Sequence, residues 1–281
     1  MVLKKTYDVA TLVPYINWLY FYHAWGLSGK SKEEKLKLRL EAEQMLGIWQ
    51  NDCHTHALFA LFEAVSDGDD IIIENSVRFP MLRQQHPAAP GEPNLCLADF
   101  IRPKSGGVAD HLGVFCTTVD AAITEAYRHD EYQQMMAQTL CDRLAEATAE
   151  KLHEEVRRQY WGYAPDEQLT IEQQHREEYQ GIRPAIGYPS LPDTSVNFIL
   201  DQLLDMKQVG IRLTETGMMT PHASVSGLMF AHPKARYFEL RFRRIGSSTP
   251  ASTTSHALAS ELYWNTPMSR MFTSRKSTVL V

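Results

Sequence analysis

The sequence lacks any long apolar run and any cluster of basic residues. No stretch of about 18 apolar residues occurs, so no membrane-spanning helix is expected. The net charge is −6, and lysine and arginine are not concentrated in a patch that could bind the phosphates of nucleic acid. The first residues, MVLKKTYDVATLV, have neither the apolar core nor the cleavage site of a signal peptide. We therefore expect no membrane partner, no nucleic-acid partner and a cytoplasmic location.

Cysteine is scarce, and no Cys-x-x-Cys pair occurs, which argues against a zinc ribbon or a redox motif. The four cysteines stand among apolar neighbours, at Cys53, Cys96, Cys116 and Cys141. We expect buried free thiols in a reducing compartment. The run Cys53-His54-Thr55-His56 offers three possible metal ligands. Structural zinc usually needs four, and no second cluster is present, so no metal site is predicted.

Motifs of several enzyme classes are also missing. Neither a G-x-S-x-G elbow nor a G-x-G-x-x-G fingerprint occurs, which leaves a serine hydrolase and a Rossmann cofactor site without support. The segment from Gly26 to Ser31, GLSGKS, superficially resembles a phosphate-binding loop. That loop needs four residues between its glycines and follows a strand, whereas this segment has two and follows a predicted helix.

Hydrophobic periodicity predicts a mixed α and β fold. The chain has 281 residues, of which 44% are apolar and 22% charged, as expected for one large globular domain with elaborations. Ser31 followed by Glu34 predicts a capping box at a helix start. Helices are expected near residues 12–23, 31–49, 170–179, 195–209 and 256–264, and strands near 71–73, 95–100, 112–118, 211–216 and 237–242.

The longest expected helix runs from about Asp120 to Tyr160. Its apolar positions repeat every four residues, so the stripe advances about 40° per repeat around a helix of 3.6 residues per turn. Such a winding stripe indicates a central helix with partners on more than one side. Glutamates form a second row at the same spacing. The stripe is Met136, Leu140, Leu144, Thr148, Leu152 and Val156, and the row is Glu146, Glu150 and Glu154.

The segment Gly181–Asp193 has three prolines and is expected to be an extended loop. Arg183 offers a planar fork suited to a carboxylate. Gly187 permits close approach of a ligand, and Tyr188 supplies a flat face and a hydroxyl. Such a loop, with exposed backbone amides, could bind a zwitterionic or adenine-containing ligand. On composition alone a structural crossover, with Arg183 in a salt bridge, is favoured.

Two glutamates are equally ambiguous by themselves. Glu146 lies three residues after Arg143, so a surface ion pair along one helix is the default interpretation. Glu177 is expected on a short polar helix, where carboxylates are usually solvated.

Several long blocks, in the same order, resemble the reactivation domain of cobalamin-dependent methionine synthase. The resemblance spans residues 13–245. The blocks are VPYINWLYFYHAWGLSGK (13–30), LADFIRPKSGGVADHLGVF (97–115), AEATAEKLHEEVRRQYWGYAPDEQLT (145–170), REEYQGIRPAIGYPSLPD (176–193) and ASVSGLMFAHPKARYF (223–238).

The resemblance implies an α+β fold, a helmet- or C-shaped single domain with a twisted antiparallel sheet and flanking helices. It would comprise residues 1–281, with N-terminal helices in 1–50 and a divergent C-terminal tail in 246–281. S-adenosylmethionine would lie in a shallow groove. The implied binding residues are Arg183, Ala185, Gly187 and Tyr188 from the loop, Tyr237 and Phe238 from a strand, and Asn17, which stands where the family has an aspartate.

In this family the domain repairs the enzyme after its cobalt(I) cofactor has been oxidised to inert cobalt(II). S-adenosylmethionine supplies a methyl group, and flavodoxin or a similar donor supplies one electron. Because the sulfonium is already activated, the protein mainly positions donor and acceptor. Glu146 and Glu177 match glutamates near the cobalt face, where they would order water or tune axial coordination.

The chain has no D-x-H-x-x-G cobalamin-binding motif and no homocysteine or folate module. The expected function is therefore reactivation within a split methionine synthase, with cobalamin supplied by a partner subunit and an electron by a flavodoxin-like donor. Two alternatives stay open. One is a non-catalytic module that binds or senses S-adenosylmethionine, and the other is a reactivator of a different corrinoid methyltransferase.

Overall fold

Two long strands run through both compact units of the structure, which is a computed structural model describing residues 1–74 and 76–240. The first unit combines Met1–Phe62 with Leu112–Ala235. The second combines Glu63–His111 with the described residues from Arg236 onward. Strands β2 (His54–Asp67) and β5 (Asp110–Val119) contribute residues to both units.

The first unit contains an antiparallel sheet. Strand β1 (Leu3–Asp8) pairs with β2, so that Leu3 lies opposite Phe59. Strand β5 neighbours β2 and pairs with β8 (Ser224–Met229), with Gly113 opposite Met229. A separate two-stranded ribbon joins β6 (Arg212–Leu213) to β7 (Met219–Thr220). The predicted strand at 112–118 is confirmed, whereas β1, β2 and β8 were not indicated by the sequence pattern.

The second unit is built on the end of β2, which pairs with β3 (Asp70–Ile73), and on β4 (Val77–Pro80), which pairs with β3. The predicted strand at 71–73 is confirmed. The strand predicted at 95–100 is wrong. Residues Leu97–Phe100 form a 3-10 helix (η2), because Asp99 accepts the backbone N–H of Cys96 at 2.9 Å and is buried against Arg83. A second 3-10 turn, η3, spans Lys104–Gly106.

The predicted helix at 12–23 is divided. It comprises α1 (Val9–Leu12), the 3-10 turn η1 (Val13–Tyr15) and α2 (Trp18–Ala24). Pro14 stands in the first turn of η1, and Asn17 caps α2, so the backbone leaves α geometry between them. The helix α3 (Lys32–Trp49) begins with the predicted capping box, in which Ser31 and Glu34 each accept the other's backbone N–H.

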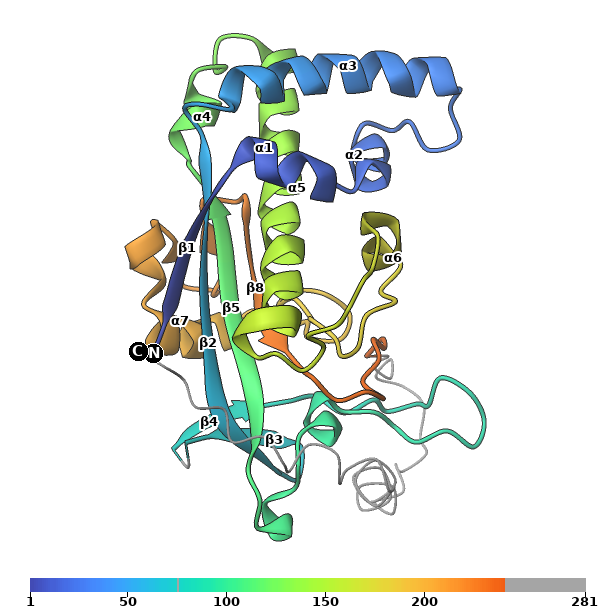
Figure 1. Cartoon of the computed structure of the whole chain (residues 1–281), viewed down its shortest axis with the longest axis vertical. Helices are drawn as coiled ribbons and strands as arrows, with labels where there is room; N and C mark the ends of the chain where they lie inside the picture. Colours follow the sequence, from blue (N-terminus) through green and yellow to red (C-terminus); the bar gives the residue numbers. More distant parts are fainter. Residues whose placement is uncertain (75, 241–281) are drawn as a thin grey trace. The chain divides into compact units, whose positions relative to one another are not determined.

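The predicted helix from Asp120 to Tyr160 is three elements. A short α4 (Ala122–Glu125) precedes α5 (Glu131–Glu155), which Asp130 caps, and a π-helical turn η4 (Val156–Tyr160) follows. The whole apolar stripe is buried, and α5 contacts α1, α2, α3, α4, η1 and β8. It also bonds to the sheet, because Thr117 on β5 donates to the Ala145 carbonyl. The prediction of a central helix is confirmed (Figure 1).

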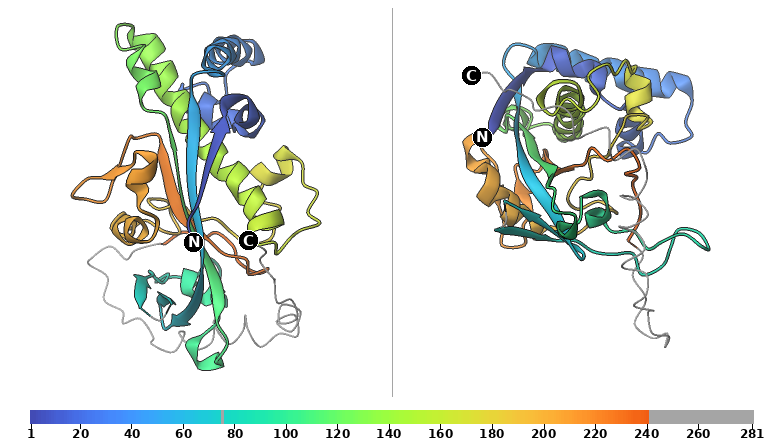
Figure 2. Two further views of the ribbon diagram at one scale, coloured as in Figure 1. Left: turned by 60° about the vertical axis from the view of Figure 1, so that its left-hand side comes forward. Right: turned by 60° about the horizontal axis from the view of Figure 1, so that its bottom comes forward.

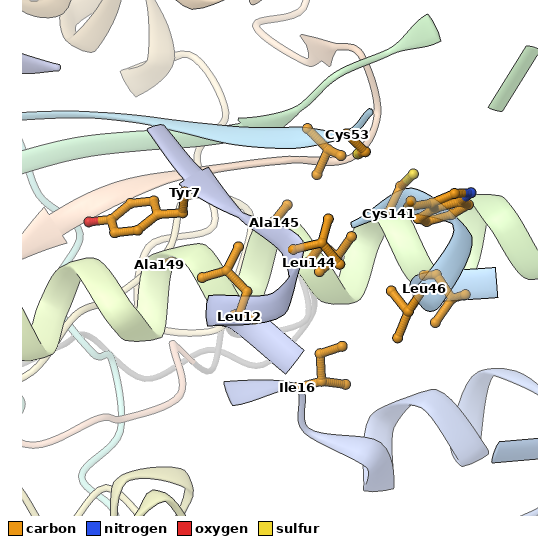
Figure 3. Packing of buried hydrophobic residues seen from close by; sticks show 14 of the residues in the cluster. Tyr7, Leu12, Ile16, Leu46, Cys53, Cys141, Leu144, Ala145 and Ala149 are labelled. Atoms are coloured by element: carbon orange, nitrogen blue, oxygen red, sulfur yellow. The ribbon is translucent and has the colours of Figure 1, made fainter. Parts of the chain in front are cut away.

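The remaining helices lie in the first unit. They are α6 (Ile171–His175), α7 (Val196–Leu204) and the 3-10 turn η5 (Met206–Val209). Two further views show α5 running beside the strands (Figure 2). The core gathers between α5, the N-terminal segments and β2, with side chains such as Leu12, Ile16 and Leu144 packed together (Figure 3).

All four cysteines are buried and free, as predicted. Within the described ranges no helix is long and apolar enough to cross a membrane. The predicted helical patch at 256–264 and the tail 246–281 lie outside the described residues.

Candidate functional site

The loop Gly181–Asp193 lies along β8 as an irregular extra strand. Ile182 exchanges two backbone hydrogen bonds with Phe230, at 3.0 and 2.9 Å. Further along, the N–H of Ile186 donates to the Ser226 carbonyl at 2.9 Å, and the N–H of Leu228 donates to the Pro184 carbonyl at 3.1 Å. The expected extended loop is confirmed, and a strand of the sheet sets its position.

Two glycines permit this close contact. Gly181 has φ +83°, and a Cβ there would stand 2.1 Å from the Phe230 carbonyl oxygen. At Gly227, on β8, a Cβ would stand 2.3 Å from the Pro184 carbonyl oxygen. Both separations are far inside van der Waals contact, so no other residue fits without moving the loop.

The tip of the loop is closed by its own backbone. The N–H of Gly187 donates to the Leu191 carbonyl at 2.8 Å, and the N–H of Tyr188 donates to the Ala185 carbonyl at 3.3 Å. Gly187 adopts φ +90° to make this turn. The expectation of exposed backbone amides is therefore wrong at Gly187 and Tyr188. The side chain of Tyr188 is exposed and can offer its ring to a ligand.

Two ion pairs lie along α5 beside the loop. Arg143 Nη2 lies 2.9 Å from Glu146 Oε1, which confirms the pair expected along the helix. Arg183 Nη2 lies 2.5 Å from Glu150 Oε1, and only 10% of its side chain is exposed. Arg183 thus makes the salt bridge foreseen for a structural crossover, and this salt bridge places its guanidinium next to the helix carboxylates.

The carboxyl groups of Glu146 and Glu177 share one electrostatic environment. Desolvation raises the pKa of Glu146, and Arg143 and Arg183 partly oppose the shift. Desolvation also raises the pKa of Glu177, the Glu150 charge adds to the shift, and Arg183 opposes it. Each carboxyl therefore keeps its proton to a higher pH than an ordinary glutamate does. The charges of Arg183 and Glu150 thus act on both predicted glutamates, which places both within the electrostatic range of this ion pair.

Glu177 is not on a helix, contrary to expectation. The predicted helix at 170–179 ends at His175, and Glu177 follows in a left-handed conformation with φ +58°. Non-glycine residues adopt this conformation at an energetic cost and occur in it more often at functional sites. His175 anchors the turn, because its Nε2 lies 3.0 Å from the Tyr15 carbonyl oxygen.

Asn17 lies at the start of α2, where its Oδ1 accepts the backbone N–H of Leu19 at 3.1 Å. Residues close to Asn17 in the sequence lie near two other segments of the site, the turn at His175 and the loop at Tyr188. Tyr15 contacts His175, and Tyr20 is close enough to Tyr188 to raise the pKa of that phenol, after desolvation and the Glu146 charge. A ligand contact of Asn17 itself stays a prediction.

Tyr237 and Phe238 belong to the second unit, whereas the other predicted site residues belong to the first. The strand predicted at 237–242 is wrong over its described part, because residues 231–240 contain no helix or strand. Residues 241 and 242 lie outside the described residues. Phe238 is buried. A role for this pair in ligand binding stays a prediction.

A buried charge network supports the segment between Glu177 and Arg183. Arg157 is fully buried and forms a bidentate pair with Glu167, at 2.8 Å from Nε and 2.6 Å from Nη2. Its guanidinium lies 4.4 Å from the ring centre of Tyr179, whose ring meets His153 edge to face. Desolvation, together with Arg157 and Arg183, holds the pKa of His153 well below its usual value, so this imidazole is neutral.

Three residues of the site were given no role by the sequence. Glu150 was visible as the next member of the glutamate row after Glu146, and that spacing was the only signal for it. Gly181 and Gly227 could not be recognised, since their requirement arises from contact between the loop and β8.

Comparison with known proteins agrees with this architecture. The sequence matches the family described as vitamin B12 dependent methionine synthase, activation domain, over residues 8–247. The chain is also similar to a solved structure of the MetH reactivation domain bound to AdoHcy, with 39% sequence identity and a TM-score of 0.80. That similarity covers 85% of this chain and 81% of the other. The α+β expectation, an antiparallel sheet with flanking helices, is confirmed, and the chain belongs to the activation-domain family of vitamin B12 dependent methionine synthase.

Proposed function

We propose that this chain binds S-adenosylmethionine beside the loop Gly181–Asp193 and α5. In this proposal it acts as the reactivation component of a split cobalamin-dependent methionine synthase. The observation that carries the proposal is the convergence of Arg183 and Tyr188 with Glu146 and Glu177, in a chain of this family. The similarity to a reactivation domain bound to AdoHcy supports the choice of ligand.

The charges at the site fit this ligand. S-adenosylmethionine carries a cationic sulfonium, a cationic ammonium and one carboxylate. Arg183 offers a cation to the ligand's carboxylate, and Glu150, which pairs with Arg183, holds a carboxylate at the same place. The exposed ring of Tyr188 offers a flat surface for adenine.

The ligand itself supplies the chemistry, which is an activated methyl group that a partner's cobalamin accepts after one-electron reduction. The protein's residues bind and orient. Arg183 would take the ligand carboxylate, and the two glutamates, which are not nucleophiles, would order water between the ligand and the partner's corrin. Ala185 and Gly187 would form the floor under the ligand.

We infer that the cobalamin is carried by a cobalamin-binding partner of this chain, as membership of the activation-domain family suggests. We infer a flavodoxin-like donor for the electron, since S-adenosylmethionine supplies a methyl cation and no reducing equivalent.

The proposal is tested by mixing the chain with a cobalamin-loaded partner domain, a reductant and methyl-labelled S-adenosylmethionine. Transfer of label to cobalamin is the expected result. Transfer of the label only to the corrinoid protein of another methyltransferase would indicate that the chain reactivates that enzyme instead. Ligand binding without transfer to any corrinoid would indicate a sensing module instead.

Asn17→Asp should tighten binding of S-adenosylmethionine about fivefold. Hydrogen bonds to charged groups contribute about 1.5–3 kcal/mol, against about 0.5–1.5 for neutral ones, and an aspartate would also compensate the ligand's positive charge. Aspartate caps helices as well as asparagine does, so α2 should be unaffected. Isothermal titration calorimetry measures the change. An unchanged or weaker dissociation constant would contradict a ligand contact at position 17.

The double variant Glu146→Gln with Glu177→Gln should slow methyl transfer while leaving S-adenosylmethionine affinity within about threefold. In the proposal the two carboxylates order water on the side that faces the cobalamin. The ligand is held by residues of the loop, which this variant does not change. Transfer rate and dissociation constant are measured on the same preparation. Equal loss in both quantities would show that the glutamates act mainly in ligand binding.

A further inference from the structure

Glu150 contacts the loop with only one of its two oxygens. Its Oε1 accepts from Arg183 Nη2 at 2.5 Å, and 22% of the side chain is exposed. Its Oε2 is shielded from solvent and has no hydrogen-bond partner within the part of the chain that the structure describes. A shielded carboxylate oxygen can only accept, so it destabilises the protein until a donor reaches it.

Among the described residues, Arg183 is engaged through Nη2 on Oε1, and no donor reaches Oε2. The carboxyls of Glu146 and Glu177 lie within electrostatic range and cannot help, because the Glu150 charge raises the pKa of both. Arg143 lies against Glu146. Any group that satisfies Oε2 should therefore come from a ligand and should be a cationic donor.

The ligand of the proposed function has one such group, its α-ammonium, next to the carboxylate assigned to Arg183. The sulfonium is cationic but carries no hydrogen to donate. The carboxylate of Glu150 and the guanidinium of Arg183 are already in contact. In the proposed complex they would lie beside a ligand whose ammonium and carboxylate are also adjacent.

We propose that Glu150 and Arg183 together recognise the amino-acid group of the ligand, with Glu150 Oε2 accepting hydrogen bonds from its ammonium. Glu150 thereby becomes a specificity-determining residue, one that selects nucleosides bearing an intact amino acid. This inference rests on the proposed function and adds a ligand contact to it.

The test compares two ligands and two proteins by calorimetry. The ligands are S-adenosylhomocysteine and its deamino analogue, which keeps the carboxylate and lacks the ammonium. The native chain should prefer S-adenosylhomocysteine about tenfold or more, the range for a hydrogen bond between charged groups. Glu150→Gln should reduce this preference to about twofold and leave the affinity for the deamino analogue unchanged.

Glu154→Gln is the matched control. Glu154 lies one turn further along α5 and bonds to Tyr15 and Arg158 rather than to Arg183. This variant should keep the native preference between the two ligands.

Three outcomes would overturn the proposal. The first is a native chain that binds both ligands equally, a result that needs no variant to fold. The second is a Glu150→Gln protein that retains the native preference, and the third is one that loses affinity for both ligands alike, as a purely structural residue would. A native chain that binds neither ligand would instead overturn the proposed function itself.

Discussion

Arg157→Met should lower the free energy of unfolding by about 3–5 kcal/mol, the cost of removing one partner from a buried ion pair. The arginine side chain is 0% exposed and that of Glu167 is 8% exposed. Without the guanidinium, Glu167 would keep its charge in a poorly solvated place, and Tyr179 would lose the cation over its ring. Chemical denaturation monitored by circular dichroism measures the effect.

The adjacent arginine is the matched control. Arg158 pairs with Glu154 at 3.1 Å, but 43% of its side chain is exposed. Solvated pairs of this kind contribute about 0–1 kcal/mol, so Arg158→Met should have a small effect. Similar losses in the two variants would refute the assignment of Arg157 as the buried support of the segment between Glu177 and Arg183.

Gly181→Ala should destabilise the first unit and weaken binding of S-adenosylhomocysteine together. Steric overlap in a packed region costs about 1–3 kcal/mol, and a left-handed conformation costs a residue with a Cβ about 1–2 kcal/mol more. The new methyl group would displace the chain from Phe230, which positions the segment leading to Arg183. Thermal unfolding and calorimetry measure the two effects.

Gly47→Ala provides the comparison. Gly47 lies on the exposed face of α3, and a Cβ there meets nothing within 4 Å. Alanine in a helix interior is favoured over glycine by roughly 0.5–1 kcal/mol, so this variant should be slightly more stable, with unchanged affinity. Native affinity in Gly181→Ala would mean that contact with β8 does not position the binding residues.

Predictions from the sequence succeeded where the determinants are local. The capping box of Ser31 and Glu34, the buried stripe of α5 and the pair of Arg143 with Glu146 all depend on residues within a few positions of one another. The prolines of the loop likewise exclude a helix by their own geometry. Failures occurred where local pattern was weak, as at η2, where a buried Asp99 paired with Arg83 overrides an apolar run that suggested a strand.

The sequence by itself determined the family, through long blocks in a common order, and it indicated the loop and the row of glutamates on α5. Only the tertiary structure decided which of these charges meet. Arg183 and Glu150 stand 33 positions apart, and the loop reaches α5 because Gly181 and Gly227 let it lie against β8. No periodicity encodes a contact between distant segments, because such a contact depends on the path of the chain between them. For the same reason the unsatisfied oxygen of Glu150 appears only when the chain is folded.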